Sequence, residues 1–265
     1  MAVIWEKRQS GNHYQVRTAG RSIRLYKNQV FHSQWNESRP LSSGVWDLLF
    51  LPALFAPEGS VKRVLVLGVG GGAVIRQYLE LLAVSSVVGV ELDPIHLQIA
   101  RDHFGLNCST VNRSSMNHSA MNQAAVELIQ ADAIEWLANY QGPKFDVVIE
   151  DLFTEQDGEP VRVVPASDRW FSRLAAVLNP GGTLIVNFED PAQLRATTLK
   201  CGNSIPGRTD SRYAFTLPTY GNCVAAFLSV SASPAELRKK LDALLVRFPA
   251  SGADAQKFRV RRVLP

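Results

Sequence analysis

The middle of the chain alternates between two hydrophobic patterns. Short apolar runs rich in Val, Ile and Leu alternate with longer stretches in which apolar positions recur every three or four residues. The runs predict strands buried on both faces, and the stretches predict helices that cover them. The predicted strands are 63–67, 86–91, 126–131, 145–150 and 182–188, and the predicted helices are 73–82, 94–104, 133–140 and 167–178. This order predicts an α/β fold with a doubly wound, mostly parallel sheet.

The N-terminal segment follows a different pattern. Alternation of polar and apolar residues, interrupted by Gly and Asn, marks three short segments: 3–8, 13–18 and 22–26. It predicts a small antiparallel β-domain. Residues 45–55 are apolar nearly all round, which predicts a helix wedged between this β-domain and the main sheet. We therefore expect two domains, 1–60 and 61–265.

The C-terminal third changes character again. Apolar runs at 213–217 and 224–230 predict an antiparallel pair that closes the sheet. Ser233 and Glu236 have the spacing of a capping box at the start of a last helix. Residues 257–262 alternate basic and apolar side chains, as expected of an edge strand with a solvated basic face.

Glycines follow the first strand of the main sheet directly. A glycine turn at the start of a helix has no side chains in the way. A nucleoside can therefore lie against the backbone N–H groups of the turn and the helix N-terminus. Acids end the next two strands, where Glu91 is spaced to accept both ribose hydroxyls and Asp132 to take the adenine amino group. The turn alone is a weak signal, because dinucleotide enzymes and plain tight turns share it. The candidate nucleoside-binding residues are Gly68, Gly70, Gly71, Gly72, Glu91, Asp132 and Ala133.

Composition narrows the function classes. With 46% hydrophobic residues the chain can bury a large core, and no apolar run approaches the ~20 residues that span a membrane. Charged residues near the start replace the apolar stretch of a signal peptide, so we expect a cytoplasmic protein. The net charge is +4, and outside 257–262 the basic residues are scattered along the sequence. No nucleic-acid partner is therefore expected. The spacing of the three cysteines fits no zinc site, so we expect free thiols. His96 and His103 also lack the spacing of metal ligands, so we expect their imidazoles to be packed or solvated and expect no metal.

The sequence resembles the spermidine synthase (polyamine aminopropyltransferase) family over nearly its whole length. The segments that carry the resemblance are 24–28, 68–72, 90–94, 131–133, 145–151 and 217–220. The resemblance implies a small N-terminal β-domain on a class I methyltransferase domain. It also implies transfer of an aminopropyl group from decarboxylated S-adenosylmethionine to an amine.

Several site residues follow from this resemblance. It implies that Glu91 holds the ribose, that Asp132 holds the adenine and that Asp151 is the catalytic aspartate. Tyr220 stands where a tyrosine lines the substrate channel. His32 stands where a glutamine usually touches the nucleoside.

The chain also departs from the family pattern. Gly71 replaces the aspartate that grips the ammonium of the decarboxylated donor, and Thr154 replaces a second acid. Trp46 and Asp47 replace a Tyr-Gln or Tyr-His pair on the substrate side. An unpaired ammonium in a partly buried site costs several kcal/mol. Gly71 would instead leave backbone N–H groups for the carboxylate of intact S-adenosylmethionine.

Asp151 is the candidate catalytic residue on chemical grounds as well. It follows the strand 145–150 at the edge where open α/β sheets bind ligands, and an ammonium acceptor must lose a proton before it attacks a sulfonium. A helix cap or turn former is the alternative for Asp151. Five acids lie between Glu150 and Glu159, and we expect a mobile gate that attracts a cationic substrate, with a solvated loop as the alternative.

Three functions remain open from the sequence. The first expectation is methyl transfer from S-adenosylmethionine to a small amine or cationic acceptor. The second is aminopropyl transfer from decarboxylated S-adenosylmethionine to a polyamine, and the third is a catalytically silent nucleoside-binding protein. No membrane partner is expected, and a homodimer is open because the family often dimerises.

Overall fold

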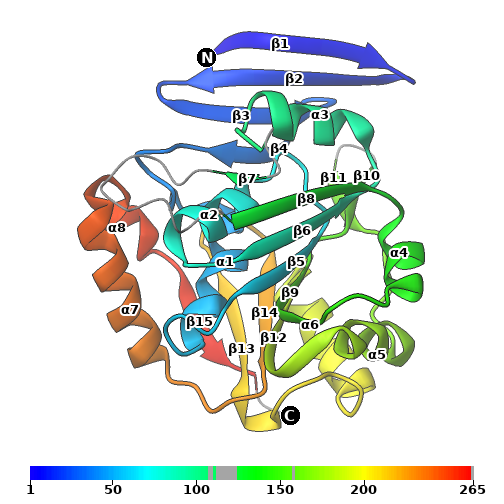
Figure 1. Ribbon diagram of the computed structural model, residues 1–265, viewed down its shortest axis with the longest axis vertical. Coiled ribbons are helices and arrows are strands. Elements are labelled where there is room, and N and C mark those ends of the chain that lie inside the picture. Colours follow the sequence, from blue (N-terminus) through cyan, green and yellow to red (C-terminus); the bar gives the residue numbers. More distant parts are fainter. Residues whose placement is uncertain (107–109, 112–123, 157–158, 264–265) are drawn as a thin grey trace.

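A computed structural model describes residues 1–106, 110–111, 124–156 and 159–263 of the chain (Figure 1). Within these residues the main sheet has nine strands. They are β5 (Arg63–Leu67), β6 (Ser86–Glu91), β7 (Thr110–Val111), β8 (Ala124–Gln130), β9 (Phe145–Glu150), β12 (Leu178–Phe188), β13 (Arg212–Thr216), β14 (Cys223–Leu228) and β15 (Arg259–Arg262). Their order across the sheet is β15-β13-β14-β12-β9-β5-β6-β8-β7.

The five central strands are parallel, and the strands β7, β13, β14 and β15 pair antiparallel. β5 pairs with β6 on one side and with β9 on the other, so the strand order reverses beside β5. A crevice opens at such a point beyond the carboxyl ends of the strands. Gly68 directly follows β5, and Asp151 directly follows β9. The Asp151 N–H donates to the carbonyl oxygen of Leu67 at 2.9 Å, so the segments that follow β5 and β9 lie side by side.

Helices cover both faces of the main sheet (Figure 1). One hydrophobic cluster joins the sheet to α1 (Val45–Phe50), the 3-10 helix Leu51–Phe55, α2 (Ala73–Leu81) and α7 (Pro234–Arg247). A second cluster joins the other face to α4 (Ala133–Asn139), α5 (Asp168–Ala176) and α6 (Pro191–Cys201). Shorter helical segments are Thr209–Ser211, Pro249–Ser251 and α8 (Gly252–Ala255). The continuous apolar runs of the central strands are explained by burial against both layers.

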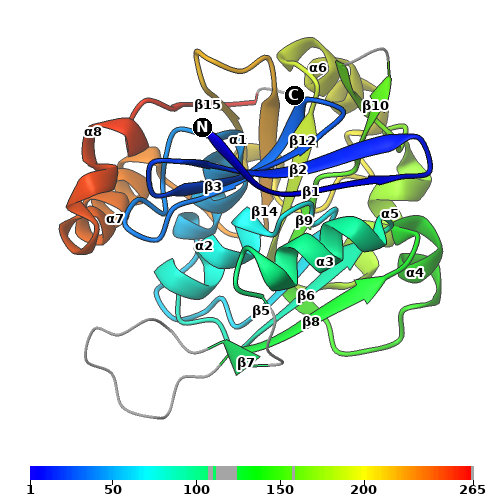
Figure 2. The same cartoon turned by 90° about the horizontal axis from the view of Figure 1, so that it is seen from above.

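The N-terminal sheet lies across one end of the molecule, beside α3 (Pro94–Asp102) (Figure 2). Its strands are β1 (Ala2–Gln9), β2 (Asn12–Ala19), β3 (Ser22–Lys27) and β4 (Val30–Trp35). Inward residues of this sheet, including Val16 and Leu25, form a third cluster with Ile95, Ile99 and Phe104. The outward positions of β2 and β3 are mostly polar, as the period-two alternation predicted, whereas Val3 and Ile4 of β1 are exposed apolar residues.

The predicted α/β class is confirmed, and most predicted bounds agree with the structure within a few residues. The sequence did not predict β4, α6 or the hairpin of β10 (Phe153–Gln156) and β11 (Glu159–Arg162). The predicted capping box is wrong, because Ser233 makes no side-chain cap bond. α1 and the 3-10 helix pack in the main core, and the predicted domain boundary at residue 60 stays a prediction. The surface loop predicted at 107–123 lies outside the described residues, apart from β7.

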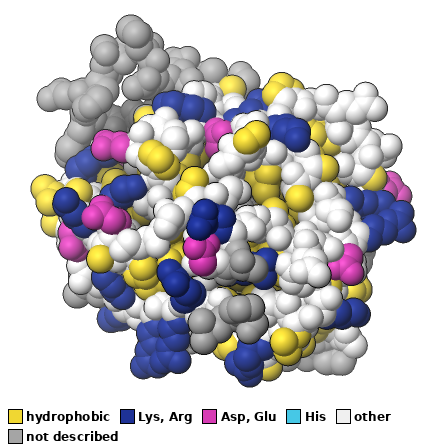
Figure 3. Space-filling model, turned by 90° about the horizontal axis from the view of Figure 1, so that it is seen from below, with side chains coloured by type: hydrophobic (Ala, Val, Ile, Leu, Met, Phe, Trp, Pro, Cys, Tyr) yellow, Lys and Arg dark blue, Asp and Glu magenta, His cyan; other side chains and the backbone are white. Residues whose placement is uncertain are grey.

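No helix in the described part of the chain is long and apolar enough to cross a membrane. On the face turned away from the N-terminal sheet, Lys and Arg side chains are spread among acidic and apolar ones (Figure 3). Cys201 and Cys223 are free and buried. The described residues hold no group of three or more His, Cys, Asp or Glu side chains arranged for a metal ion.

Candidate nucleoside and acceptor site

The glycine turn is shaped by the backbone beside it. Gly68 has φ +88°, and a β-carbon there would lie 2.1 Å from the carbonyl oxygen of Asp151. No side chain can occupy this position, so Gly68 is required for the two strand exits to meet. Gly70 has φ +54° and is the more open position, since its nearest neighbour would be the His32 carbonyl oxygen at 3.4 Å.

Gly71 and Gly72 face protein instead of a ligand. A β-carbon at Gly71 would lie 2.8 Å from both Phe104 and Ser33, and one at Gly72 would lie 2.4 Å from Leu106. The segment that follows residue 102 and the N-terminal sheet therefore close over this part of the turn. The absence of an aspartate at Gly71 has a packing reason, and the inference from Gly71 to the donor's charge does not hold.

Glu91 at the end of β6 braces the turn. Its Oε2 accepts the N–H groups of Val69 and Gly70, both at 2.9 Å, and its Oε1 accepts the Asp93 N–H at 2.9 Å. Burial opposes ionisation of this carboxyl, but His96 and the backbone donors outweigh it and hold its pKa below the usual value. A carboxylate offers about four lone-pair positions, so three are already used. We expected Glu91 to accept both hydroxyls of a ribose. These hydroxyls would have to compete with the backbone N–H groups of the turn for the carboxylate oxygens of Glu91.

His96 belongs to this site, although its spacing in the sequence gave no sign of it. Its buried ring lies 3.7 Å from Glu91 Oε1, and its centroid lies 5.3 Å from that of His32. The Nε2 atoms of both rings are buried without a hydrogen-bond partner. Burial lowers the pKa of His32 to about 4, with smaller contributions from His96 and Lys27, so His32 is neutral at pH 7. The His96 Nε2 lies 4.0 Å from Asp93 Oδ2, and both Nε2 atoms are free of hydrogen bonds and so could accept or donate to a bound polar group.

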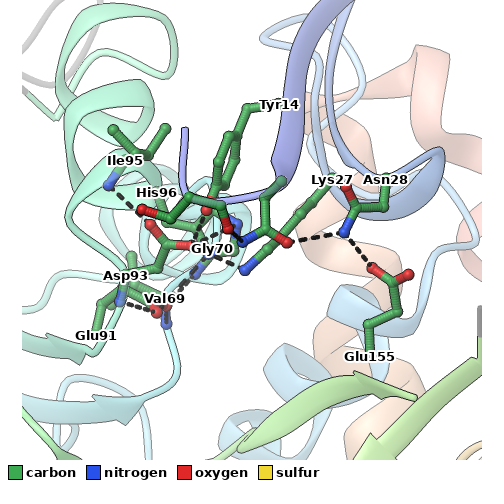
Figure 4. A network of polar contacts seen from close by, with 12 residues as sticks. Tyr14, Lys27, Asn28, Val69, Gly70, Glu91, Asp93, Ile95, His96 and Glu155 are labelled. Atoms are coloured by element: carbon green, nitrogen blue, oxygen red, sulfur yellow. Dashed lines mark hydrogen bonds and ion pairs between the residues drawn. The ribbon is translucent and has the colours of Figure 1, made fainter. Parts of the chain in front are cut away.

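The N-terminal sheet closes one side of the site through Asp93. Tyr14 donates to Asp93 Oδ2 at 2.8 Å, and the Lys27 ammonium lies 3.0 Å from the same atom (Figure 4). Burial raises the pKa of Asp93, but the surrounding cations and donors more than offset this and lower it. Lys27 and Tyr14 come from β3 and β2, so the two sheets meet at this carboxylate.

Asp132 sits at the next strand end and begins α4. Its Oδ1 accepts the N–H groups of Ile134 and Glu135 at 2.7 and 3.1 Å, which caps the helix. The Ala131 N–H donates to the Glu91 carbonyl oxygen at 3.0 Å, so the two predicted nucleoside acids stand on adjacent strand ends. An open pocket of about 450 Å³ lies beside Asp132, and its lining residues are Ala131, Asp132, Glu135, Trp136, Asn139, Tyr140 and Gln141. Ala133 is buried beneath the cap.

Asp151 is a shielded carboxyl held by amides. Asn187 Nδ2 donates to Asp151 Oδ1 at 2.8 Å, and Asn222 Nδ2 donates to Asn187 Oδ1 at 3.2 Å. Burial raises the pKa of Asp151 to about 6, opposed by the Asn187 bond and assisted by the charge of Glu91. Neither asparagine was predicted, because each is far from Asp151 in the sequence. A carboxylate with a pKa near 6 is suited to accept a proton at neutral pH.

The acidic segment after Asp151 contains two paired strands, β10 and β11, where a mobile gate or a solvated loop was expected. The attraction of a cationic substrate to this segment stays a prediction. Glu150 is fully buried and paired with Arg162 of β11, whose Nη1 also donates to the Val164 carbonyl oxygen. Asn28 in the β3–β4 turn donates to Glu155 at 3.2 Å, so the hairpin touches the N-terminal sheet (Figure 4). Asp157 lies outside the described residues.

Trp46 and Asp47 lie in the interior. Trp46 is 6% exposed and belongs to the main core, and Asp47 is 3% exposed. Asp47 accepts the N–H groups of Ser42 and Ser43 at 2.9 and 2.7 Å and the Gln77 amide at 2.7 Å. The structure therefore does not place these two predicted substrate residues where a substrate can reach them. Asp47 instead shapes the turn before α1.

Tyr220, the third predicted substrate residue, does line a pocket. The pocket has a volume of about 630 Å³, and its lining residues are Ser43, Leu217, Pro218, Thr219, Tyr220, Lys257 and Arg259. It lies between the β13–β14 turn, β15 and the segment that precedes α1.

Comparisons with known proteins agree with this arrangement. The family model of the spermine/spermidine synthase domain matches residues 47–240. Polyamine aminopropyltransferase 2 from Caldanaerobacter subterraneus subsp. tengcongensis is 33% identical over 140 residues, which are 53% of this chain and 42% of that protein. A probable spermidine synthase from Corynebacterium glutamicum aligns over 99% of this chain and 91% of its own, with a TM-score of 0.68 and 15% identity. Human methyltransferase-like protein 13 in complex with SAH aligns over 77% and 90%, with a TM-score of 0.53 and 19% identity.

The two solved structures show the fold alone, and the matched region is less than half the length of the curated relative. More distant curated relatives also carry the name polyamine aminopropyltransferase. The expectation of methyl transfer is therefore wrong, because the sequence relatives are named for aminopropyl transfer. The expectation depended on Gly71, which the packing of Phe104 and Ser33 explains without reference to the donor.

Proposed function

Because the chain belongs to the spermine/spermidine synthase family, we propose that it transfers an aminopropyl group from decarboxylated S-adenosylmethionine to a small amine. The observation that carries the proposal is the position and the raised pKa of the Asp151 carboxyl. This carboxyl stands at the carboxyl end of β9, beside the glycine turn, with a pKa raised to about 6 and an orientation fixed by Asn187. A base of this kind is what an ammonium acceptor requires.

The proposed reaction is an in-line displacement. The acceptor nitrogen attacks the methylene carbon next to the sulfonium, a C–N bond forms as the C–S bond breaks, and 5′-methylthioadenosine leaves as a neutral thioether. The acceptor nitrogen gives up a proton, which Asp151 receives. The protein supplies alignment and the base, since the leaving group needs no proton.

The donor is proposed to lie along the strand ends. Glu91 would exchange part of its bonding to the turn for a ribose hydroxyl, and Asp132 would accept the adenine amino group through Oδ2, because its cap bonds fall on Oδ1. Leu92, a hydrophobic side chain that is 66% exposed beside Glu91, offers an apolar surface to the base. The unpartnered Nε2 atoms of His32 and His96 fit a bound polar group at the same place.

The test is incubation of the full chain with decarboxylated S-adenosylmethionine and a panel of primary amines. We expect release of 5′-methylthioadenosine together with an aminopropylated amine, both detected by mass spectrometry. Asp151→Asn removes the base while keeping the shape, and should lower kcat/KM by about 10²–10⁴-fold.

Intact S-adenosylmethionine is the control donor and should give no methylated amine. Absence of 5′-methylthioadenosine with every amine would refute the proposal. An Asp151→Asn variant that retains full activity would remove Asp151 from the mechanism but leave the transfer itself intact.

A further inference from the structure

His96, in the first turn of α3, lies between two acids at the start of that helix (Figure 4). Its Nδ1 is 3.7 Å from Glu91 Oε1, and its Nε2 is 4.0 Å from Asp93 Oδ2. The residue is 6% exposed, and both separations exceed the length of a hydrogen bond. Buried polar atoms are normally hydrogen-bonded, yet Nε2 has no partner. Packing alone therefore does not explain an imidazole at this position.

The N-terminal sheet holds the ring of His96 in place. Tyr14 of β2 meets the ring edge-on, with centroids 5.9 Å apart and planes 82° apart. A register shift in the pairing of β3 with β4 leaves His32 without a partner residue on β3. Such a bulge re-aims a side chain, and the centroid of the His32 ring lies 5.3 Å from that of His96. The imidazole of His96 is thus confined beside Glu91.

The two carboxylate oxygens of Glu91 have different surroundings. Oε2 accepts the N–H groups of Val69 and Gly70 in the glycine turn, whereas Oε1 accepts the Asp93 N–H and faces His96. A ribose hydroxyl that displaces the turn from Oε2 leaves the contacts of Oε1 in place. Burial opposes ionisation of Glu91, and His96 is the largest influence that lowers the pKa of this carboxyl. His96 therefore favours the form of Glu91 that accepts hydrogen bonds.

We propose that His96 is a positioning residue for the donor, which donates a hydrogen bond to Glu91 Oε1 and so aims Oε2 at a ribose hydroxyl. The inference rests on the proposed function and deepens it, because it adds to the donor site a residue that acts through Glu91. A small movement that closes the 3.7 Å separation completes the bond. A hydrogen bond to a charged acceptor is stronger than one between neutral groups. His96 should thus matter for nucleosides that carry the ribose hydroxyls and not for those that lack them.

Two nucleosides test this role: 5′-methylthioadenosine, the product of the proposed transfer, and its 2′,3′-dideoxy analogue, which lacks both hydroxyls. Calorimetry on the full chain gives the dissociation constant of each. His96→Leu should weaken binding of 5′-methylthioadenosine about tenfold or more, because the N–H donor to Glu91 is lost. It should change binding of the dideoxy analogue by less than about twofold. A merely structural role would weaken both nucleosides alike.

Two further variants are the controls. His96→Gln keeps an N–H donor and should retain most of the preference for the hydroxyls. His103→Leu is the matched control, since His103 follows the same helix and its ring lies near Trp5, 5.8 Å between centroids. It should bind both nucleosides as the native chain does.

A measurement on the native chain applies even if His96→Leu does not fold. Nitrogen-15 NMR follows Nδ1 of the His96 ring, whose signal is assigned by its loss in His96→Gln. Addition of 5′-methylthioadenosine should move this signal as the bond to Glu91 forms, and the dideoxy analogue should leave it in place.

Several results would overturn the inference. They are an equal loss of both nucleosides in His96→Leu, no loss of either, a glutamine variant as weak as the leucine variant, and loss of the preference in His103→Leu. A native chain that binds neither nucleoside, or an Nδ1 signal that both nucleosides move alike, would overturn it as well.

The transfer assay separates this inference from the proposed function. Aminopropyl transfer by His96→Leu with an unchanged KM for the donor would overturn the role of His96 and support the transfer. Loss of the hydroxyl preference in His96→Leu, without transfer by the native chain to any amine, would refute the transfer and uphold the role of His96.

Discussion

At the scale of single residues, the proposed reaction depends on how the carboxyl of Asp151 is kept ready to accept a proton. Burial and the negative charge of Glu91 raise the pKa of Asp151, while the Asn187 amide stabilises its ionised form. The result is a pKa of about 6, which leaves most of the carboxyl ionised at pH 7. Asn187 is thus a positioning residue that acts through Asp151.

Replacement of Asn187 should shift the pH dependence of the reaction. Asn187→Ala removes the donor that favours the ionised carboxylate, so the pKa of Asp151 rises and the acid limb of kcat/KM moves up by on the order of one pH unit. Activity should fall more at pH 6 than at pH 9. A pH–rate profile measures this, with Asn222→Ala as a control whose shift should be smaller. A loss by the same factor at every pH would contradict the assigned role.

At the scale of elements, the β10–β11 hairpin is fixed to the sheet by a buried ion pair. Glu150 and Arg162 have side chains that are 0% and 3% exposed, and the Arg162 guanidinium also lies over the Phe188 ring. Removal of one partner from such a pair leaves an uncompensated charge, whereas removal of both is tolerated far better. The hairpin therefore depends on the charge balance of these two residues.

The prediction for this element is a comparison of single and double variants. Arg162→Met should lower the free energy of unfolding by about 3–5 kcal/mol, because Glu150 would be buried without its partner. The double variant Arg162→Met and Glu150→Leu should recover most of this loss. Urea unfolding measures both. A single variant within about 1 kcal/mol of the native chain would show that the pair is dispensable.

At the scale of the whole molecule, the N-terminal sheet and α3 meet the glycine turn. A β-carbon at Gly71 would meet Phe104, which follows α3, and Ser33 of β4. The Lys27–Asp93 ion pair joins the same two units. The proposed donor site therefore has one wall from each unit. A residue in the turn cannot be interpreted from the turn alone.

Introduction of the family's aspartate tests this view. Gly71→Asp should not strengthen donor binding and should destabilise the chain by about 1–3 kcal/mol, because its β-carbon meets Phe104 and Ser33. Addition of Phe104→Ala makes room at one contact and should reduce the steric part of this penalty. Thermal unfolding and calorimetry with decarboxylated S-adenosylmethionine measure the two effects. Tighter donor binding without loss of stability would restore the electrostatic interpretation of Gly71.

The sequence by itself determined the local periodicity of this protein and hence its elements. Short apolar runs rich in Val, Ile and Leu between helical patterns predict strands buried on both faces, and strand ends in a parallel sheet must meet at one edge, so Glu91, Asp132 and Asp151 could be grouped in advance. Only the tertiary structure decided what these groups touch. His96, Asn187 and the packing at Gly71 depend on contacts between residues far apart in the chain, and periodicity carries no information about such contacts. Burial then sets the pKa of Asp151, and burial is a property of the folded molecule alone.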